Sequence, residues 1–576
     1  MSLSGAQIVV KALEDEGVKF SFGIPGTHNI ELYDALLETE KIITILVTDE
    51  QSASFMADGV ARASGSLAAL NLVPSAGLTN AMSGIAEAFL DQVPMLVLSC
   101  GIRRDKKFAY QLHDVDQAGL ARPVCKEVFI IKTHEELYPT IRAACRLAQK
   151  PPCGPVMVEV PVHLYLFPSE LTVDQLQLPD FEDTPPSLNP QTLQVIRQCL
   201  HQSSSIGIYA GAGALGARDE LLELAEKLDA IIFTTISGKG LFPENHPRWG
   251  WVTMGAAAPK EIQRLEKELD CLLAIGCRFG EVATGSYGFH PPKNLIHIDI
   301  DPGVFNKNFQ AQHILQGEAR EVLKPLLPLL QTHPTNQERL QRLSEAHQWI
   351  RKEQCAIKEK TQGVSPALFL AALQGQFGPQ TIFVTDSGNG TFVAMELLRL
   401  TEPRSFLGPI DYSCMGYSTP AAIGAKLAAP DRPVVALIGD GAFLMTGLEL
   451  LTAATYGIGV VACLLHDGEL SQIAQFQRKA LGREGWTAVH DFQADPLSRA
   501  MGVDYVGIQN DSTIKEGVRQ AFEISQKGRP VLVDVAIDYS TPTYFTKGVV
   551  KTNLLRLPWK DRLRMVGRVL KRKITG

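Results

Sequence analysis

The stretch VVALIGDGAFLMTGLELLTAATYGIGVVACLLHDGEL, residues 434–470, decides the fold of this 576-residue chain. An apolar run at 434–438 is followed by a Gly-Asp-Gly turn, a segment of helical length and a second apolar run at 460–465. Apolar runs without polar alternation are typical of parallel strands covered on both faces. The stretch therefore predicts a strand–helix–strand unit within a parallel sheet.

The same alternation extends over most of the chain, which is too long for a single hydrophobic core. Further apolar runs of strand length are IITILVT, MLVLSC, VMVEVP, IGIYAG, CLLAIG, LIHIDI, TIFVTD and VLVDVAI. We expect an α/β fold with three doubly wound parallel-sheet domains. The expected limits are 1–165 for the N-terminal domain, 190–330 for a central Rossmann-like domain and 365–548 for the C-terminal domain. A Pro-rich acidic linker at 166–189, a polar helical linker at 331–364 and a basic tail at 549–576 complete the expected organisation.

The bulk properties exclude several classes of function. The formal net charge of −7 gives the whole chain no electrostatic reason to bind nucleic acid. The 10 cysteines are scattered, and no pair has the C-x-x-C spacing of a zinc or redox site. The N-terminus lacks the regions of a signal peptide, and no apolar run approaches the roughly 18 to 20 residues that span a bilayer. We therefore expect a cytoplasmic protein with reduced thiols.

Two carboxylates in the opening stretch are spaced for metal binding. Asp440 follows the first strand, and Asp467 follows the next strand 27 positions later. Ligands of parallel sheets bind at the carboxyl ends of the strands, so both side chains are expected to face one crevice. Gly439 and Gly441 let the backbone turn sharply and bring N–H groups close to an anion. Two hard oxygen donors beside an anion site predict Mg²⁺ bound to a diphosphate.

This motif resembles the diphosphate and metal motif of thiamine-diphosphate enzymes, and MTGLELLTAA resembles their acetolactate synthase branch. The resemblance implies that Asp440 and Asp467 bind Mg²⁺ through their side chains and Glu469 through its backbone oxygen. One departure is that His466-Asp467 stands where the family usually has Asn-Asn, which adds a negative charge. The implied cofactor contacts in this motif are Gly439, Asp440, Gly441, Ala442, Asp467, Glu469 and Leu470.

Two further segments of the C-terminal domain carry the resemblance. DYSCMGYSTPAAIGA is similar to the family's MGYGLPAAIGA, which implies that Met415 is the apolar wedge that bends the cofactor into a V shape. VTDSGNGTF, residues 384–392, resembles the loop that caps the diphosphate. The implied contacts in that loop are Gly388, Asn389 and Gly390. The resemblance thus makes the N-terminal domain pyrimidine-binding and the C-terminal domain diphosphate-binding.

In the N-terminal domain, VTDEQSASFMADGVARASG places Glu50 at a strand end before a helix. The resemblance implies that Glu50 hydrogen-bonds N1′ of the aminopyrimidine. Such a bond favours the imino form of the ring, which removes the proton from C2 of the thiazolium. The segments FGIPGTHNIELYDAL and PSAGLTNAM supply the other implied cofactor contacts, Pro25, Ser75 and Asn80.

The expected substrate pocket differs from that of a biosynthetic acetolactate synthase. Thr27 and His28 stand where those synthases have small residues, and His113 stands where they have a glutamine. With Glu50, either histidine is a candidate catalytic residue that donates a hydrogen bond or transfers a proton. In LSQIAQFQ, Gln472 and Phe476 are further pocket candidates. Phe476 replaces the tryptophan that selects 2-oxobutyrate, which weakens an assignment to isoleucine synthesis.

The central domain and the tail leave alternatives open. IGIYAGAGALG resembles part of a dinucleotide-binding turn, but Gly280-Glu281-Val282 replaces the segment typical of FAD-binding synthases. FAD is therefore a doubtful cofactor.

In the tail, one helical face carries Trp559, Leu563, Val566 and Leu570 amid Lys and Arg. We favour packing over the active site or fraying of the tail, and we expect no membrane contact, although such a helix can lie on a membrane surface.

The expected function is thiamine-diphosphate- and Mg²⁺-dependent decarboxylation of a small 2-oxo acid. The product is an aldehyde or the result of carboligation to a second carbonyl compound, as in acetolactate synthases. The resemblance implies a homodimer or homotetramer with active sites at the subunit interface. The alternatives are an FAD-linked oxidase of the pyruvate oxidase type at a membrane surface, and a non-catalytic homologue that still binds the cofactor.

Overall fold

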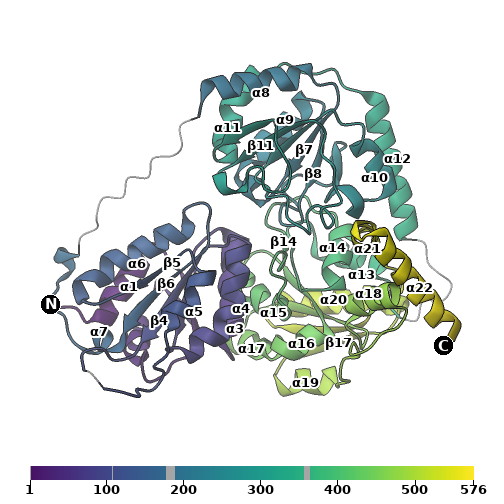
Figure 1. The fold of residues 1–576 in the computed structure, drawn as a ribbon. Helices are drawn as coiled ribbons and strands as arrows, with labels where there is room; N and C mark the ends of the chain where they lie inside the picture. Colours follow the sequence, from purple (N-terminus) through teal and green to yellow (C-terminus); the bar gives the residue numbers. More distant parts are fainter. Residues whose placement is uncertain (1, 107, 177–187, 356–362, 576) are drawn as a thin grey trace.

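A computed structural model describes residues 2–106, 108–176, 188–355 and 363–575 (Figure 1). Three lobes follow one another along the chain, and each is built around a six-stranded sheet. Parts of the two expected linkers, residues 177–187 and 356–362, lie outside the described residues. The described remainder of the second linker contains helix α12 (Gln337–Gln354).

The N-terminal sheet is parallel throughout and has the strand order β2-β1-β3-β4-β6-β5. Its strands are β1 (Phe20–Gly23), β2 (Ile43–Leu46), β3 (Ala69–Leu72), β4 (Met95–Gly101), β5 (Glu127–Ile130) and β6 (Pro155–Pro161). The helices that cover it are α1 (Gly5–Asp15), α2 (Ile30–Leu37), α3 (Glu50–Ser64), α4 (Ala76–Leu90), α5 (Gln117–Ala121), α6 (His134–Gln149) and α7 (Val162–Leu166).

The central sheet has the order β12-β11-β10-β7-β8-β9, which is the strand order of a Rossmann fold. Its strands are β7 (Ile206–Ala210), β8 (Ile231–Thr234), β9 (Trp249–Val252), β10 (Cys271–Ile275), β11 (Asn294–Asp299) and β12 (His313–Gln316). Its helices are α8 (Pro190–Gln202), α9 (Arg218–Lys227), α10 (Lys260–Glu266) and α11 (Ala319–Leu326). The expected Rossmann-like sheet is therefore confirmed.

The C-terminal sheet has the order β14-β13-β15-β16-β18-β17, which repeats the connectivity of the N-terminal sheet. Its strands are β13 (Ile382–Thr385), β14 (Phe406–Leu407), β15 (Val434–Gly439), β16 (Val461–His466), β17 (Asp504–Ile508) and β18 (Val531–Ala536). Its helices are α13 (Pro366–Phe377), α14 (Asn389–Leu397), α15 (Ser418–Ala428), α16 (Asp440–Thr446), α17 (Leu450–Tyr456), α18 (Ser471–Leu481), α19 (Ala494–Ala500) and α20 (Ile514–Ser525). Three parallel α/β sheets confirm the expected fold class.

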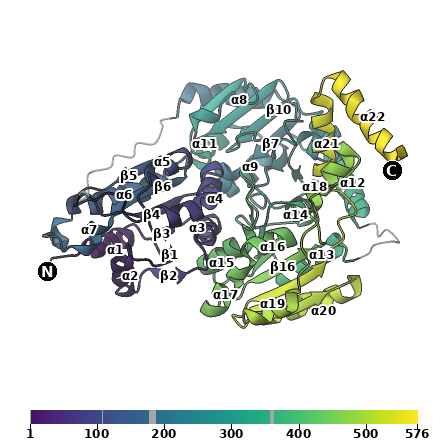
Figure 2. The same ribbon diagram turned by 60° about the horizontal axis from the view of Figure 1, so that its bottom comes forward.

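The N-terminal and C-terminal sheets share one continuous hydrophobic core, because α3 packs against α15. Figures 1 and 2 both place α3 beside α15. A Cβ atom at Gly59 would lie 2.1 Å from the carbonyl oxygen of Ala421, and one at Gly424 would lie 2.0 Å from that of Met56. The two helix backbones therefore touch, and only glycine leaves room for this contact.

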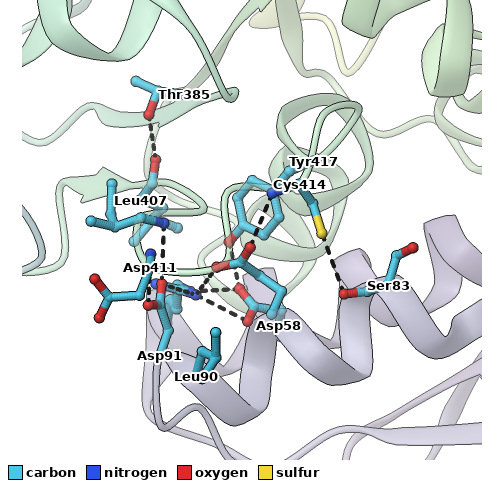
Figure 3. A network of polar contacts seen from close by, with 12 residues as sticks. Asp58, Ser83, Leu90, Asp91, Thr385, Leu407, Asp411, Cys414 and Tyr417 are labelled. Carbon is cyan, nitrogen blue, oxygen red and sulfur yellow. Dashed lines mark hydrogen bonds and ion pairs between the residues drawn. The ribbon is translucent and has the colours of Figure 1, made fainter. Parts of the chain in front are cut away.

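A buried polar network crosses the same contact (Figure 3). Arg62 lies between three carboxylates, 2.6 Å from Asp58, 2.9 Å from Asp91 and 3.7 Å from Glu87. From the C-terminal side, Tyr417 donates a hydrogen bond to Asp58. Burial, and then the nearby Asp91 carboxylate, raise the pKa of Glu87 well above its usual range. One guanidinium cannot balance three charges here, so Glu87 retains a proton.

The helix contact gives a first test in Gly59→Ala. The added methyl group must push α3 away from α15, and we expect the free energy of unfolding to fall by about 1 to 3 kcal/mol. Gly375→Ala is the matched control, because a Cβ at this helical glycine would meet nothing within 4 Å. Alanine there should stabilise the helix slightly. Urea denaturation of both variants measures the effect, and equal midpoints would contradict the close contact.

The buried proton gives a second test in Glu87→Gln. Wild-type Glu87 keeps a proton that the unfolded chain releases, so stability falls as pH rises above the ordinary carboxyl range. Glutamine stays neutral in both states. Between about pH 6 and about pH 9, the free energy of unfolding of the variant should therefore fall by about 1 to 3 kcal/mol less than that of wild type. Urea midpoints at the two pH values provide the measurement, with exposed Glu223→Gln as the control. Parallel pH dependences for Glu87→Gln and wild type would refute the retained proton.

Candidate active site

The strand–helix–strand unit predicted from residues 434–470 is present as β15, α16 and β16. The two strands are parallel neighbours, with Gly439 aligned to Leu465. Asp440 therefore begins α16 at the same sheet edge where Asp467 follows β16. Asp440 accepts hydrogen bonds from the backbone N–H groups of Gly441 and Gly468, both at 2.7 Å. The two aspartates therefore lie at the same edge of the C-terminal sheet.

The two aspartates form an electrostatically unfavourable pair. Burial, together with the Asp440 carboxylate, raises the pKa of Asp467 to about 6, although Ser471 donates a hydrogen bond to it. A divalent cation between the carboxylates would remove this penalty. Among the described residues, no three His, Cys, Asp or Glu side chains converge on a metal site. A cation here would draw its other ligands from backbone oxygens, water or a bound anion.

His466, the departure from the Asn-Asn pattern, is held by the C-terminal sheet. Its Nδ1 atom lies 3.1 Å from Asp534 on β18, and this hydrogen bond raises the pKa of His466. Tyr505 donates a second hydrogen bond to Asp534 at 3.1 Å. The imidazole Nδ1 is therefore engaged by the C-terminal sheet, and of these two residues Asp467 supplies the oxygen ligands for a cation.

The predicted diphosphate loop, residues 384–392, runs from the end of β13 into the first turn of α14, which begins at Asn389. Asn389 is buried, and its Nδ2 donor has no hydrogen-bond partner. Gly388 has a φ of 130°, which favours glycine. A buried amide donor without a partner is costly, and an anionic ligand would satisfy it. The loop thus fits an anion such as a diphosphate.

Met415 and Leu470 lie against the Gly-Asp-Gly turn. A Cβ at Gly441 would lie 2.7 Å from Leu470 Cδ2 and 3.4 Å from Met415 Cε.

Asp386, which the sequence reasoning did not single out, holds the segment that follows Met415 in place. Its carboxylate accepts hydrogen bonds from the N–H groups of Gly416 at 2.9 Å and Ser418 at 2.8 Å. Burial raises the pKa of Asp386 to about 6. Its only sequence signal is its place at a strand end in VTDSGNG.

Glu50 is the first residue of α3 and is only 6% exposed. Asn80 donates a hydrogen bond from Nδ2 to Glu50 Oε2 at 3.0 Å. A Cβ at Gly77 would lie 3.1 Å from Glu50 Oε1, so the glycine keeps a side chain away from this oxygen. Among the described residues, Oε2 is held by Asn80, and no hydrogen bond holds Oε1.

The predicted pocket residues of the N-terminal domain cluster near Glu50's sheet edge. The rings of His28 and His113 are 5.3 Å apart in an edge-on arrangement, and Thr27 Oγ1 is 3.2 Å from His28 Nδ1. Ser75 Oγ donates to the backbone oxygen of His113 at 2.8 Å. Burial, and then the nearby His113, lower the pKa of His28. Pro25 is exposed in the same loop as Thr27.

Two buried residues that the sequence reasoning missed support these loops. Gln117 accepts a hydrogen bond from Ser75 N–H at 3.0 Å and donates one to the Cys100 backbone at 2.9 Å. Glu449 accepts hydrogen bonds from Thr48 N–H at 3.2 Å and from Thr452 at 2.6 Å. Glu449 lies in the quoted MTGLELLTAA motif, but its partner is 401 positions away, so no local pattern could indicate its role.

The candidate residues form two groups rather than one. Within the described residues, no hydrogen bond or ion pair joins Glu50 to Asp440 or Asp467. Glu50 and the histidines belong to the N-terminal sheet, whereas Met415, the two aspartates and the Asn389 loop belong to the C-terminal sheet. Gln472 and Phe476, both half-buried, lie on α18 directly after the metal motif.

Protein-family models match all three lobes of the chain. Residues 3–120 match the "Thiamine pyrophosphate enzyme, N-terminal TPP binding domain", 193–326 match its central domain and 386–535 match its "C-terminal TPP binding domain". Thiamine pyrophosphate is another name for thiamine diphosphate. The three matches follow the same order as the three sheets.

Similar proteins span nearly the whole chain. A probable acetolactate synthase large subunit of Methanocaldococcus jannaschii is 34% identical over 93% of this chain and 92% of its own. The acetolactate synthase large subunit of Haemophilus influenzae is 30% identical over 94% of this chain and 96% of its own. Acetolactate synthase isozyme 3 large subunit of Escherichia coli is 29% identical over 94% and 96%.

The described site has the donor groups that thiamine diphosphate and Mg²⁺ require. It has two carboxylates at one sheet edge for a divalent cation, a buried amide donor without a partner for an anion, and the buried carboxylate of Glu50, whose Oε2 is held by Asn80. Together with the family matches, these features identify an acetolactate synthase-like enzyme that uses both cofactors. The chain belongs to the thiamine pyrophosphate enzyme family.

Proposed function

We propose that the protein decarboxylates a small 2-oxo acid and either releases an aldehyde or joins the remaining fragment to a second carbonyl compound. When bound, thiamine diphosphate supplies the electron sink for cleavage beside the carbonyl. The observation that carries the proposal is Glu50, a buried carboxylate whose Oε2 accepts a hydrogen bond from Asn80 and whose Oε1 lies beside Gly77, which has no side chain. Glu50 holds a proton at N1′ of the aminopyrimidine, as a catalytic acid requires.

Asp440 and Asp467 hold Mg²⁺ through their side chains, and Glu469 holds it through its backbone oxygen. The contacts of Glu469 support binding through its backbone oxygen rather than its side chain. Its side chain accepts a hydrogen bond from Arg478 at 2.5 Å and is therefore engaged away from the metal. Ser471 orients Asp467 by a hydrogen bond, so the carboxylate does not need the cation to stay in place.

The remaining cofactor contacts divide between the two groups of residues. On the diphosphate side these are Gly388, Asn389, Gly390, Met415, Gly439, Gly441, Ala442 and Leu470. On the pyrimidine side they are Pro25, Ser75 and Asn80. The Asn389 donor without a partner is evidence for the diphosphate side. The packing of Met415 and Leu470 against Gly441 is evidence for an apolar surface beneath the cofactor rings.

His28 or His113 donates a hydrogen bond to the substrate carboxylate or transfers a proton during the reaction, and Thr27 lines the same pocket. The lowered pKa of His28 keeps this imidazole neutral near pH 7, so it can accept a proton or donate an N–H. The hydrogen bond between Ser75 and the His113 backbone fixes the position of that residue. Gln472 and Phe476 face the substrate from α18.

FAD is not one of the cofactors that we propose for this protein. Glu281, in the segment that departs from the FAD-binding pattern, accepts a hydrogen bond from Ser286 at 2.8 Å and closes its own turn. No helix among the described residues is both long and apolar enough to cross a membrane.

The active enzyme is a homo-oligomer in which each active site combines the pyrimidine side of one subunit with the diphosphate side of another. Two observations support this arrangement. Within one chain, Glu50 and the aspartates belong to separate groups. Large apolar side chains beside the Gly-Asp-Gly helix are exposed, among them Met445 at 53% and Leu448 at 59%. Such a surface is expected to be covered by another subunit.

The role of Glu50 is tested by Glu50→Gln. The variant should bind thiamine diphosphate with an affinity close to that of wild type, because the amide keeps the shape of the carboxyl group. It should lose about 100-fold or more of the rate of proton exchange at C2, because glutamine cannot share the proton with N1′. Hydrogen–deuterium exchange followed by NMR measures this rate. Exposed Glu40→Gln is the control, and wild-type exchange in Glu50→Gln would exclude the assignment.

The metal site is tested by Asp467→Asn. Asparagine keeps an oxygen ligand and removes one of two repelling charges, so the variant should bind the cofactor and need no more Mg²⁺ than wild type. Asp440→Ala removes the acceptor of the Gly468 N–H, and it should raise the Mg²⁺ requirement about tenfold or more. Calorimetric titration with Mg²⁺ and thiamine diphosphate compares the two. Complete loss of metal binding in Asp467→Asn would mean that the negative charge is essential.

A further inference from the structure

Glu449 is a buried carboxylate that the proposed function does not use. It is 0% exposed and lies at the end of the 3₁₀ turn η7 (Gly447–Glu449), which continues directly from α16. Asp440 begins this helical stretch, so one short element of the C-terminal lobe carries the metal candidate at its start and Glu449 at its end. Thr452 Oγ1 donates a hydrogen bond to Glu449 Oε1 at 2.6 Å and thus holds the carboxylate from the same lobe.

From this position Glu449 reaches the N-terminal lobe and holds the residue two positions before Glu50. The Thr48 N–H group donates to Glu449 Oε1 at 3.2 Å and to Oε2 at 3.3 Å, and Thr48 Oγ1 donates to Oε2. Thr48 lies in the loop that joins the end of β2, at Leu46, to the start of α3, at Glu50. The Leu46 N–H group donates a further hydrogen bond to Tyr456 Oη at 3.0 Å. The C-terminal lobe therefore holds this loop at two points.

The backbone of Glu50 is fixed on its other side by the N-cap residue of α3. Asp49 Oδ1 accepts hydrogen bonds from the N–H groups of Gln51 at 2.7 Å and Ser52 at 3.1 Å. Such a cap closes the first turn of a helix. Glu50 thus stands between Thr48, which the opposite lobe holds, and a closed helical turn.

The contact with Thr48 depends on the carboxylate of Glu449. Burial raises the pKa of Glu449, whereas hydrogen bonds from Thr452 and Thr48 act in the opposite direction. A buried carboxylate is costly unless donors of this kind surround it. Loss of the carboxylate would in turn leave the Thr48 N–H group without this acceptor, which is also costly. Removal of Glu449 should therefore release the loop.

The position of the Glu50 carboxylate depends on the position of this loop. Asn80 donates to Glu50 Oε2 at 3.0 Å, but a hydrogen bond at the end of a side chain does not fix the backbone that carries it. A displacement of about 1 Å in an active site can lower a reaction rate about 100-fold. The bonds from Glu449 to the loop are therefore as relevant to proton transfer as the bond from Asn80.

We propose that Glu449 is the positioning residue for Glu50, and that its buried carboxylate keeps the Glu50 carboxylate at N1′ of the aminopyrimidine. This inference rests on the proposed function and adds to it a residue of the opposite lobe that acts through Glu50. The stretch from Asp440 to Glu449 then has two roles, because it begins at the metal site and ends at the loop that carries Glu50.

Glu449→Leu in the full-length holoenzyme tests the proposal, because leucine removes the acceptor of Thr48 and keeps a side chain of similar size. The rate of proton exchange at C2 of thiamine diphosphate should fall about tenfold or more, as is typical when a residue that orients a functional group is lost. The affinity for thiamine diphosphate and Mg²⁺ should change less than about threefold, because the N–H groups that hold Asp440 belong to Gly441 and Gly468. NMR measures the exchange, and calorimetric titration measures the affinity.

A double-mutant cycle with Glu50→Gln separates positioning from a general structural effect. A residue that acts through Glu50 has little left to contribute once the Glu50 carboxylate is gone. Adding Glu449→Leu to Glu50→Gln should therefore lower the exchange rate less than about twofold further. An additional loss of about tenfold would mean that Glu449 acts elsewhere, and it would overturn the proposal.

Glu396→Leu is the matched control. Glu396 is also buried, and it accepts hydrogen bonds from the N–H groups of Tyr544 at 3.1 Å and Phe545 at 2.8 Å. These two residues begin α21 (Tyr544–Arg556), which precedes the tail helix α22 (Trp559–Thr575) and lies apart from α3 in both ribbon views (Figures 1 and 2). Urea denaturation should show a loss of stability in both leucine variants, but Glu396→Leu should keep C2 exchange within about threefold of wild type.

Thr48→Val provides a second test that does not depend on the folding of Glu449→Leu. Valine keeps the size of the side chain and the N–H group but removes the hydroxyl donor, so the exchange rate should fall about threefold or more. Thr48→Ser keeps the hydroxyl and should retain the wild-type rate.

Two sets of outcomes distinguish failure of this inference from failure of the proposed function. Wild-type exchange in folded Glu449→Leu, or in Thr48→Val if the leucine variant does not fold, would overturn the positioning role and leave the proposed function intact. An equal loss of exchange in Glu396→Leu would do the same. A wild-type protein that neither exchanges the C2 proton nor consumes any 2-oxo acid would overturn the proposed function itself.

Discussion

The backbone contact between α3 and α15 fixes the N-terminal sheet against the C-terminal sheet, and both halves of the candidate site depend on it. Glu50 is the first residue of α3, and Met415 lies three residues before α15. A change in the spacing of the two helices would therefore move Glu50 relative to Met415. The glycines at the crossing, Gly59 and Gly424, thus set the relative position of these two candidate residues.

The network around Arg62 and the pair of site aspartates both bring carboxylates close together, and their negative charge is balanced in different ways. At the helix contact, three carboxylates share one guanidinium, and the excess charge is removed by a proton on Glu87. At the sheet edge, Asp440 and Asp467 are held close together by backbone N–H groups and Ser471. Their charge is best balanced by a cation that arrives with the cofactor. Burial of carboxylates thus stabilises a domain contact in one place and prepares a binding site in the other.

The sequence predicts the parts of the fold and site that depend on short-range pattern. The Gly-Asp-Gly turn, the spacing of Asp440 and Asp467 and the long apolar strands were all recognisable, because each lies within one strand–helix–strand unit. Short strands such as β1, β9 and β14 carry too few residues for a clear period. The supporting roles of Asp386, Gln117 and Glu449 depend on partners that are distant in sequence, and only the folded chain brings them together.

The identical strand order of the first and third sheets has a consequence for how this protein arose. Two copies of one ancestral sheet, joined in a single polypeptide, would have this order and would present equivalent loops at their edges. Ser75, before the helix that follows β3, then corresponds in position to Gly439 and Asp440 after β15. The chain thus carries two sheets of one connectivity, separated along the sequence by a sheet of Rossmann order.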